Sequence, residues 1–516
     1  MTGKKVLMLC CSESGHSNVY MATVHSLLKQ DPSVELHLGS FARLEDTFRE
    51  AVETHNCSEK KKPVFHPIRG PPIFEVLDRD PDPDRRMLDV ARLAPGFWNT
   101  PRAIRFFLLK MASSWTTGEY VDIFEQVSRI VDQVSPDVIV IDGLFSPALS
   151  AVQHLKKQKA ADGSGFKLAV LSPNSLKDFT CHLEGGNSNW MKWPVHGAAL
   201  PMPLTWPSVL LNWYFLKRIM YELPRNTEVP AWTEDIKQKL GLPGLEVASM
   251  MTLVGGGAAL MDRVLLSSAP EVDFPNLDLE CGPKEYRDKI VCCGPILNSA
   301  VSLRESDPEL TSWAGQGPVV YINFGTLCRL QESEVVEMSR ALRALLDKGD
   351  PNLRILWKLA KETKRAPEYG TGPGSAVYEI LGKEITQDRV RIVDWIRTQP
   401  ASLLESGLVT CAITHGGASS FYEAVLAGVP QIVLPVWADT YDYANRAEMM
   451  GIGRWGNKSA CPRWSAPELT PILKDVVIDN HAHYAANSRM VAAKSKERGT
   501  GRDIAAQTIL GLLGQH

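Results

Sequence analysis

Short apolar runs alternate with helical patterns of hydrophobic positions along most of the chain. In the first half, runs typical of buried strands lie at residues 5–11, 34–38, 138–141, 167–171, 263–266 and 290–293, and helical patterns lie at 17–29 and 121–134. A second series of runs lies at residues 319–324, 354–359, 390–393, 409–414 and 431–435. This alternation predicts parallel sheets covered by helices. The pattern therefore indicates two Rossmann-like halves.

A polar segment with glycine and proline at both ends separates the two series. Gly294-Pro295-Ile296 closes the first series, and Gly317-Pro318 precedes the second. We expect a domain of residues 1–296, a linker of residues 297–317 and a second domain of residues 318–516, because a chain of 516 residues is too long for one ordinary core. The pattern of residues 481–513 is helical, with a break at Gly499 and Gly501, and we expect these helices to return to the first domain.

Composition narrows the class of protein. The hydrophobic fraction of 44% and the charged fraction of 22% are typical of globular proteins. The net charge of −3 provides no basic footprint for nucleic acid. The ten cysteines form no C-x-x-C pair, and Cys10, Cys11, Cys293 and Cys411 lie in apolar runs where a thiol acts as a small hydrophobe. These features favour a cytoplasmic protein.

No segment is long and apolar enough to predict a membrane span. Residues 198–220 are rich in Leu, Trp and Phe but carry three prolines, and residues 250–261 are far short of the ~20 apolar residues that a spanning helix needs. The first segment has two interpretations, which are packing in the core or a pocket and peripheral contact with a membrane surface. The side chains concerned are Trp206, Trp213, Tyr214 and Phe215 beside Lys217 and Arg218.

The strand at residues 409–414 runs directly into a turn of small residues and then a helix. The turn is His415-Gly416-Gly417-Ala418-Ser419-Ser420, and the helical run ends near Gly428. Two glycines allow the backbone to approach an anion, and the amide groups and dipole of a helix N-terminus favour negative charge. The turn therefore predicts a site for a diphosphate, although such turns are also simple tight connections.

Several further motifs follow one another in the order found in one enzyme family. They are SESGHSNVYMATVHSLL, VIVIDGLFSPA, RVLLSSAPEVD and VCCGPI in the first half, and VVYINFGTL, ILWKL and the glycine turn in the second. With these motifs the chain resembles the UDP-glycosyltransferases of glycosyltransferase family 1 over nearly its whole length. The segment DTYDYANRAEMMGIGRWGN resembles a fungal branch. The resemblance implies the α/β GT-B fold, which has two facing Rossmann-like domains with parallel sheets, an acceptor site in the first and a UDP-sugar site in the second.

The resemblance identifies His16 as the general base and Asp142 as the carboxylate that orients it. An imidazole that titrates near neutral pH can take a proton from an acceptor hydroxyl, which is worth ~10² to 10⁴ in rate. Asp142 ends its own strand and would stabilise the imidazolium, as in a catalytic triad. A helix-capping histidine and a turn-forming aspartate are the alternatives for these two residues.

The resemblance also implies the residues that bind UDP. Trp395 would stack on uracil, Glu423 would accept the ribose hydroxyls, and the glycine turn would hold the diphosphate in place of a metal ion. A half-buried tryptophan and a solvent-facing glutamate are the structural alternatives. The full expected set is Thr326, Trp395, Gln399, His415, Gly416, Gly417, Ser419, Ser420 and Glu423.

Some positions differ from the family pattern. Gln399 lies one residue further from Trp395 than in the usual Trp-x-x-Gln, and the usual Asp-Gln that contacts the donor sugar is Asp439-Thr440 here. The aspartates at 78, 80, 82 and 84 alternate with other residues, but prolines among them indicate a solvated loop, and we expect no metal site. The turn after the first strand, CSESGHS, has a single glycine and lacks G-x-G-x-x-G, which argues against a dinucleotide oxidoreductase. No G-x-S-x-G is present to support a hydrolase.

We expect an inverting, metal-independent transferase with no cofactor. It would move a hexose, for which glucose is the first candidate, from a UDP-sugar to a hydroxyl of a small hydrophobic acceptor. A phenol, polyketide, terpenoid or sterol acceptor is favoured by aromatic residues in the variable middle of the chain, which are Phe97, Trp98, Phe106, Phe107, Trp115, Trp190, Trp193 and Trp206. The alternatives are a catalytically silent UDP-sugar-binding subunit and a nucleotide-sugar epimerase of the same fold.

Overall fold

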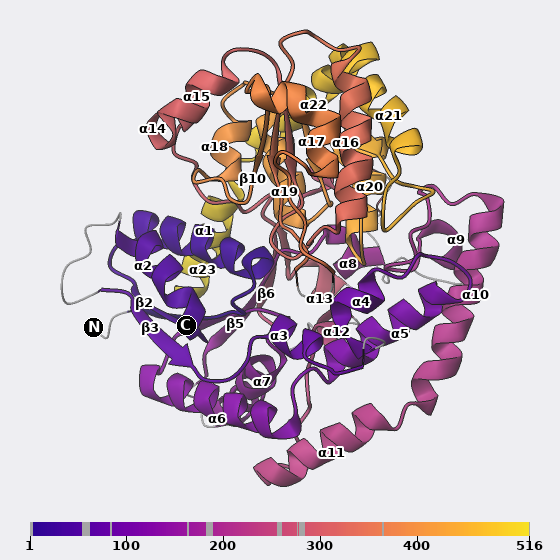
Figure 1. The fold of residues 1–516 in the computed structure, drawn as a ribbon. Coiled ribbons are helices and arrows are strands. Elements are labelled where there is room, and N and C mark those ends of the chain that lie inside the picture. Colours follow the sequence, from indigo (N-terminus) through magenta and orange to yellow (C-terminus); the bar gives the residue numbers. More distant parts are fainter. Residues whose placement is uncertain are drawn as a thin grey trace.

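Two parallel sheets organise the computed structural model of the protein, one in each half of the chain (Figure 1). The structure describes residues 4–53, 62–82, 85–161, 165–181, 189–254, 261–275, 277, 284–363 and 366–514. The residues before 300 form the lower part of the molecule in Figure 1, and most of the later residues form the upper part. The expected GT-B arrangement of two Rossmann-like sheets is confirmed.

In the described residues, the first sheet has seven strands in the order β3-β2-β1-β4-β5-β6-β7. All neighbouring strands pair in parallel. The strands are β1 (Lys5–Leu9), β2 (Glu35–Phe41), β3 (Val64–Ile68), β4 (Val138–Ile141), β5 (Lys167–Ser172), β6 (Arg263–Leu266) and β7 (Ile290–Cys292).

The second sheet, again within the described residues, has six strands in the order β10-β9-β8-β11-β12-β13. It is also parallel throughout. The strands are β8 (Val319–Asn323), β9 (Arg354–Lys358), β10 (Val390–Val393), β11 (Val409–Thr414), β12 (Gln431–Val433) and β13 (Gly453–Trp455).

The apolar runs predicted the interior strands, and sequence analysis missed the edge strands β3 and β13. β1 and β4 are continuous apolar runs because parallel sheets are covered by helices on both faces. β3 contains His66 and Pro67, and β13 is only Gly453–Trp455, so neither shows such a run. Proline is tolerated in an edge strand, where one row of backbone groups is unpaired.

Helices cover both faces of each sheet (Figure 1). In the first half they are α1 (Ser14–Gln30), α2 (Glu45–Glu53), α3 (Ile73–Asp78), α4 (Met87–Ala91), α5 (Asn99–Ala112), α6 (Thr117–Val134), α7 (Ser146–Ala161), α8 (Leu176–Thr180), α9 (Asn189–Lys192), α10 (Trp206–Glu222), α11 (Glu228–Leu240), α12 (Met250–Val254) and α13 (Lys284–Arg287). In the second half they are α14 (Leu303–Ser306), α15 (Pro308–Ala314), α16 (Glu332–Leu346), α17 (Ala376–Thr386), α18 (Pro400–Leu404), α19 (Ala418–Ala427), α20 (Thr440–Met449), α21 (Ala466–Lys474), α22 (His481–Glu497) and α23 (Gly501–Leu513). None of the helices in the described ranges is long and apolar enough to cross a bilayer.

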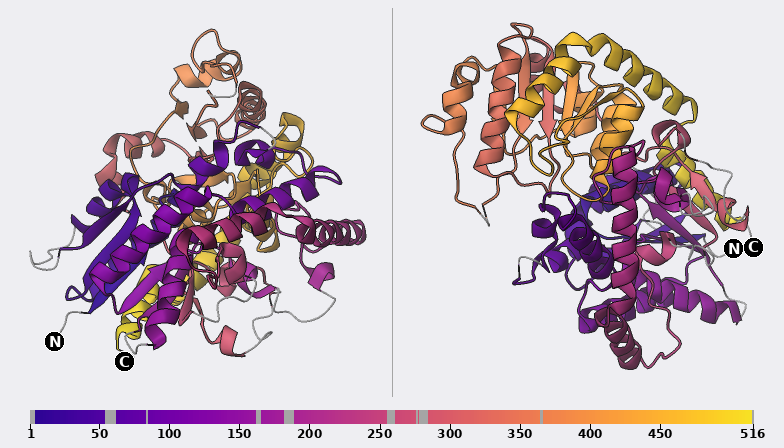
Figure 2. Two further views of the ribbon diagram at one scale, coloured as in Figure 1. Left: turned by 90° about the horizontal axis from the view of Figure 1, so that it is seen from below. Right: turned by 90° about the vertical axis from the view of Figure 1, so that its right-hand side faces the viewer.

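The last helix returns to the first half of the chain, as the sequence predicted. Helix α23 packs against α1, and its Ile509 and Leu512 are buried in one cluster with Val6 and Met8 of β1. The hydroxyl of Ser26 donates a hydrogen bond to the Asp503 carboxylate at 2.5 Å. The two chain ends consequently lie on the same half of the molecule (Figure 2).

Helix α20 of the second half is bound to the first half by polar side chains. Asp442 forms a buried ion pair with Lys177 of α8. The amide of Asn445 donates to the Leu200 carbonyl at 2.9 Å and accepts from the Met202 amide at 3.0 Å. These contacts hold the N-terminus of α20 at the boundary between the two halves.

Arg446 on the same helix completes this boundary. Its guanidinium lies 3.6 Å from the Asp273 carboxylate, and both side chains are fully buried. It also lies over the ring of Tyr443, 3.9 Å from the ring centroid. A charged pair tolerates such burial only when partners surround it, so α20 has a defined position against the first half.

Candidate active site

The two candidate site halves lie where each sheet reverses its strand order. In the first sheet the reversal falls between β1 and β4, and in the second between β8 and β11. Ligands of open parallel sheets bind in the crevice outside the carboxyl ends of the strands at this point. His16 follows β1, Asp142 follows β4, Thr326 follows β8 and His415 follows β11. The topology thus places these four residues at ligand-binding edges.

His16 and Asp142 are in direct contact. Nδ1 of His16 lies 2.9 Å from Oδ1 of Asp142, and Leu9 pairs with Ile141 at the ends of their strands, which brings the two loops together. The Asp142 carboxylate also accepts the backbone N–H groups of Cys11 at 3.2 Å and Leu144 at 2.9 Å. With the proton on Nδ1 donated to Asp142, the lone pair of Nε2 remains available to a substrate.

The charge around His16 favours its protonated form. Burial lowers the pKa of the imidazole, but the Asp142 carboxylate, with smaller contributions from Glu13 and Asp439, raises it above its ordinary value. His16 is still 17% exposed, so a substrate can reach it. Asp439 belongs to the other half of the chain, so charges from both halves influence this pKa.

The backbone of the glycine turn packs closely against neighbouring residues. Gly416 has a φ of +80°, and a Cβ there would lie 2.9 Å from the Thr440 carbonyl oxygen. Gly325, with a φ of +73°, allows the loop after β8 to approach His415, because a Cβ there would lie 2.8 Å from Cε1 of the imidazole. The structure therefore brings Thr326 and the glycine turn to one place.

The first turn of α19 begins beside the glycine turn. Gly417 precedes the helix, and Ser419 and Ser420 are partly exposed within its first turn. His415 is neutral in this environment, since burial first and the Lys358 ammonium second lower its pKa to about 4. Its buried Nδ1 has no hydrogen-bond partner among the described residues. Such a group is suited to bind a ligand.

Sequence analysis missed Lys358, which ends β9. Its ammonium donates to the Gly325 carbonyl at 3.4 Å and lies 4.4 Å from the centroid of the Trp395 ring. Burial lowers its pKa, and no carboxylate of the described residues pairs with it. The only signal in the sequence was its place at the carboxyl end of a predicted strand, which it shares with many structural residues.

Trp395 and Gln399 are both exposed in the segment between β10 and α18. Trp395, two residues after β10, is 67% exposed, which leaves a ring face open to stacking. Gln399 precedes α18 and is exposed. Glu423 lies in α19, where burial first and the neighbouring Glu405 second raise its pKa to about 8. Glu423 is partly buried and not fully exposed to solvent.

Asp439 and Thr440 lie at the N-terminus of α20 but differ in their surroundings. Burial raises the pKa of Asp439 to about 6, with Asp178 and Asp442 adding to the shift and His196 opposing it. Thr440 is buried, and its hydroxyl accepts from the backbone amides of Val436 and Trp437 and donates to the Trp437 carbonyl. Its side chain is therefore used within the turn, and the expected sugar contact of this pair falls to Asp439.

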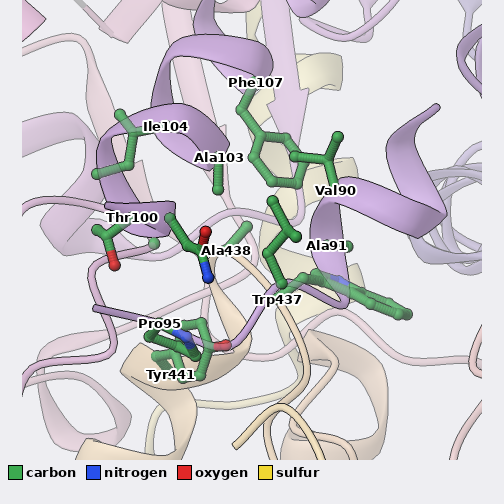
Figure 3. Close-up of a pocket in the computed structure, with 13 residues that line it drawn as sticks. Val90, Ala91, Pro95, Thr100, Ala103, Ile104, Phe107, Trp437, Ala438 and Tyr441 are labelled. Carbon is green, nitrogen blue, oxygen red and sulfur yellow. The ribbon is translucent and has the colours of Figure 1, made fainter. Parts of the chain in front are cut away.

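A pocket lies between the halves next to Asp439 (Figure 3). Its lining is mainly apolar and comes from α4, α5 and the loop that precedes α20. The labelled side chains are Val90, Ala91, Pro95, Thr100, Ala103, Ile104, Phe107, Trp437, Ala438 and Tyr441.

Only one of the expected aromatic residues lines this pocket, namely Phe107. Trp115 and Trp193 are buried in hydrophobic clusters, and Phe106 packs against the core. Phe97, Trp98 and Trp206 are exposed, and the side chain of Trp190 lies outside the described residues. An aromatic residue in the sequence does not by itself distinguish a pocket from a core.

Two clusters of acidic residues are candidates for a metal site. Among the described residues, ligand atoms of Asp178, His196 and Asp442 lie within 4.8 Å of one another. The Lys177 ammonium already pairs with Asp442, so a cation there would meet like charge. In the predicted solvated loop, Arg85 and Lys110 pair with Asp80, whereas Asp84 lies outside the described residues.

Comparisons with known proteins agree with this geometry. Residues 382–509 match the family model "Erythromycin biosynthesis protein CIII-like, C-terminal domain". The chain is similar to the glycosyltransferase sdnJ of Sordaria araneosa, with 29% identity over 514 residues, which cover 98% of this chain and 94% of that protein. It is 26% identical to a UDP-glycosyltransferase of Talaromyces amestolkiae over 43% of this chain and 42% of that protein.

Two solved structures share the fold over the whole length. A UDP-glucosyltransferase from Polygonum tinctorium, described as capable of glucosylating indoxyl, superposes with a TM-score of 0.63 at 13% identity and covers 100% of both chains. The glycotransferase of kitacinnamycin has a TM-score of 0.60 at 15% identity and covers 99% of this chain and 100% of its own. Two facing parallel sheets with the last helix on the first define the GT-B fold. In sequence the chain is similar to the UDP-glycosyltransferases of family 1.

Proposed function

We propose that this protein transfers a hexose, first of all glucose, from a UDP-sugar to a hydroxyl of a small hydrophobic acceptor, with inversion at the sugar C1 and without a metal ion. The observation that carries the proposal is the His16–Asp142 pair, whose imidazole is also influenced by the Asp439 carboxylate of the other half. A base on one side of the crevice and an anion cradle on the other are what direct displacement of a diphosphate needs.

In the proposed reaction, Nε2 of His16 removes the proton of the acceptor hydroxyl as its oxygen attacks C1. The bond between C1 and the β-phosphate oxygen breaks, and UDP leaves with the electron pair. The Asp142 carboxylate stabilises the imidazolium that forms, because it already raises the pKa of that ring. One displacement on the face opposite UDP inverts the configuration.

The second half would bind UDP through the groups around the glycine turn. Trp395 offers a face to uracil, Glu423 lies where ribose hydroxyls would meet it, and the α19 N-terminus with Ser419 and Ser420 meets the diphosphate. Thr326 in the loop after β8 and Gln399 at the N-terminus of α18 complete the proposed set. The Lys358 ammonium supplies positive charge, which supports metal-independent departure of UDP.

The apolar pocket of Figure 3 supports a hydrophobic acceptor, because its lining reaches Ala438, the residue next to Asp439. The direct test incubates wild type, His16→Ala and Asp142→Asn with UDP-glucose and a panel of phenolic acceptors, with products followed by mass spectrometry. We expect His16→Ala to lose ~10² to 10⁴ in rate while UDP still binds. Unchanged product formation by His16→Ala would remove the proposed base, and product without any acceptor would indicate an epimerase.

A further inference from the structure

Exposed apolar side chains are concentrated on one face of the first half. Of the large hydrophobic residues that are exposed in the described ranges, most lie in residues 97–98 and 191–223. They are Phe97, Trp98, Met191, Trp206, Leu210, Trp213, Met220, Tyr221 and Leu223. We call these nine residues the α10 face. Scattered exposed apolar residues are ordinary, but a contiguous group indicates an interaction site.

The α10 face follows the helical period on the solvent side of α10. Trp206, Leu210, Trp213 and Met220 are spaced by four, three and seven residues and so line one side of the helix. The adjoining side buries Val209, Asn212 and Phe215 against the protein. A surface helix usually presents polar residues to water, so α10 departs from that pattern on the side that it leaves open. Figure 2 shows α10 along the outside of the molecule in its right-hand view.

The segment before α5 extends this face toward the pocket between the halves. The ring of Phe97 stacks on Tyr214 of α10 with centroids 4.0 Å apart, and Trp98 is 80% exposed. The next residues along the chain, Asn99 and Thr100, line the pocket. The α10 face is therefore continuous with the helix that lines the proposed acceptor site.

Basic side chains accompany the aromatic rings. Residues 189–225 contain Lys192, Lys217, Arg218 and Arg225 against a single carboxylate, Glu222. The Arg225 guanidinium lies 3.7 Å from the ring centroid of Tyr221, and the Lys217 ammonium lies 5.8 Å from that of Trp213. Tryptophan, tyrosine and long cationic side chains together are typical of the membrane–water interface, where rings sit at headgroup depth and cations reach lipid phosphates.

We propose that the α10 face binds the surface of an anionic lipid bilayer and that lipophilic acceptors enter the pocket from there. The membrane source of the acceptor rests on the proposed function, whereas the binding itself does not. A helix of 17 residues that lies flat in the interface explains the apolar stripe and the cations together. A second copy of this chain would explain the apolar stripe but would place the same cations opposite one another.

The test is flotation of the full chain with vesicles of phosphatidylcholine alone and of phosphatidylcholine mixed with phosphatidylserine. We expect wild type to bind the mixed vesicles and to bind the neutral ones more weakly. The variant Trp206→Ser/Leu210→Ser/Trp213→Ser should lose at least tenfold in partitioning. The variant Lys217→Gln/Arg225→Gln should lose about fivefold per cation on mixed vesicles only.

The matched control is Val301→Ser/Met490→Ser, which removes exposed apolar side chains outside the α10 face and should bind as wild type does. Unchanged UDP binding and melting temperature would show that each variant is folded. Three outcomes would each overturn the proposal. They are a wild type that binds neither kind of vesicle, a triple variant that still binds them, and a wild type that is a dimer while the triple variant is a monomer. Because vesicle binding needs no catalysis, its failure is distinguishable from failure of the proposed transferase activity.

Discussion

At the scale of residues, the site combines one imidazole whose pKa is raised with one whose pKa is lowered. His16 has a carboxylate partner that raises its pKa, whereas His415 lies near the Lys358 ammonium and has a pKa of about 4. The same side chain is thereby suited to proton transfer in the first half and to neutral hydrogen bonding in the second. Their environments, and not their identity, separate these two roles.

Lys358 gives the first prediction at this scale. We expect Lys358→Met to weaken UDP binding by ~10- to 100-fold, because a charge-assisted contact to phosphate contributes about 1.5–3 kcal/mol. Uridine, which lacks the diphosphate, should bind equally to both proteins in calorimetry. The control is Lys361→Met, whose ammonium lies 5.7 Å from the Tyr369 ring centroid and away from the glycine turn. Equal losses for UDP and uridine would mean that Lys358 only supports Trp395.

Glu423 gives a prediction for pH dependence. Its pKa of about 8 means that the carboxyl is mostly protonated at neutral pH in the unliganded protein. Ribose hydroxyls donate to the ionised form, so UDP binding should release a proton, and affinity should rise as the pH increases from 6.5 toward 8 by at most tenfold per unit. Glu423→Gln should bind UDP more weakly with no such rise. Calorimetry at pH 7 in buffers of different ionisation enthalpy measures the proton release, and a pH-independent wild type contradicts this role.

At the scale of elements, the interior strands and the edge strands β7 and β10 were predictable, whereas the edge strands β3 and β13 were not. A buried parallel strand must be apolar on both faces, which produces a continuous apolar run such as Val138–Ile141. β3 and β13 each pair with a neighbouring strand on one side only. His16 and Asp142 could be paired from the family resemblance, and the structure shows that both follow strands that adjoin in a parallel sheet. The role of Lys358 could not be predicted, because only the three-dimensional structure shows that no carboxylate of the described residues pairs with its ammonium.

Local pattern also could not predict where a side chain points. Thr440 follows Asp439 in the place of a sugar-binding residue, but its hydroxyl hydrogen-bonds within the turn at residues 436–437. Trp115 was grouped with pocket residues, but it is buried and donates from Nε1 to the Pro71 carbonyl at 2.9 Å. In both cases the competing partner is backbone that folding brings close, which residue type and spacing do not encode.

Helix α20 gives a prediction at this scale. We expect Asp442→Asn to destabilise the protein by about 3–5 kcal/mol and to lower its melting temperature by several degrees, because the Lys177 ammonium would remain buried without a counter-charge. The double variant Lys177→Met/Asp442→Leu should recover most of the loss, since it removes both charges. Differential scanning calorimetry of the full chain provides the comparison. A single variant as stable as wild type would show that the pair is solvated.

At the scale of the whole molecule, α23 links the end of the chain to the first sheet. Ile509 is fully buried among residues of α1 and β1, so Ile509→Ala should cost about 2–5 kcal/mol in stability. Leu510 is only partly buried, and Leu510→Ala should cost less. Neither residue is near the glycine turn, so UDP affinity should be unchanged in titration calorimetry. A loss of UDP affinity in folded Ile509→Ala would instead indicate that α23 controls the position of the second half.

The return of α23 has a mechanical consequence. The backbone leaves the first sheet after β7 and comes back between α22 and α23, and the two passages touch, because Arg502 donates to the Leu297 carbonyl at 3.0 Å. Beside them, Arg498 pairs at 2.6 Å with Glu271, which lies before β7 in the first half. Two adjacent covalent passages fix one pivot line about which the halves can rotate. Any rocking motion that admits substrates must therefore turn about this line, and stiffening it would slow turnover without altering a single group that touches the substrates.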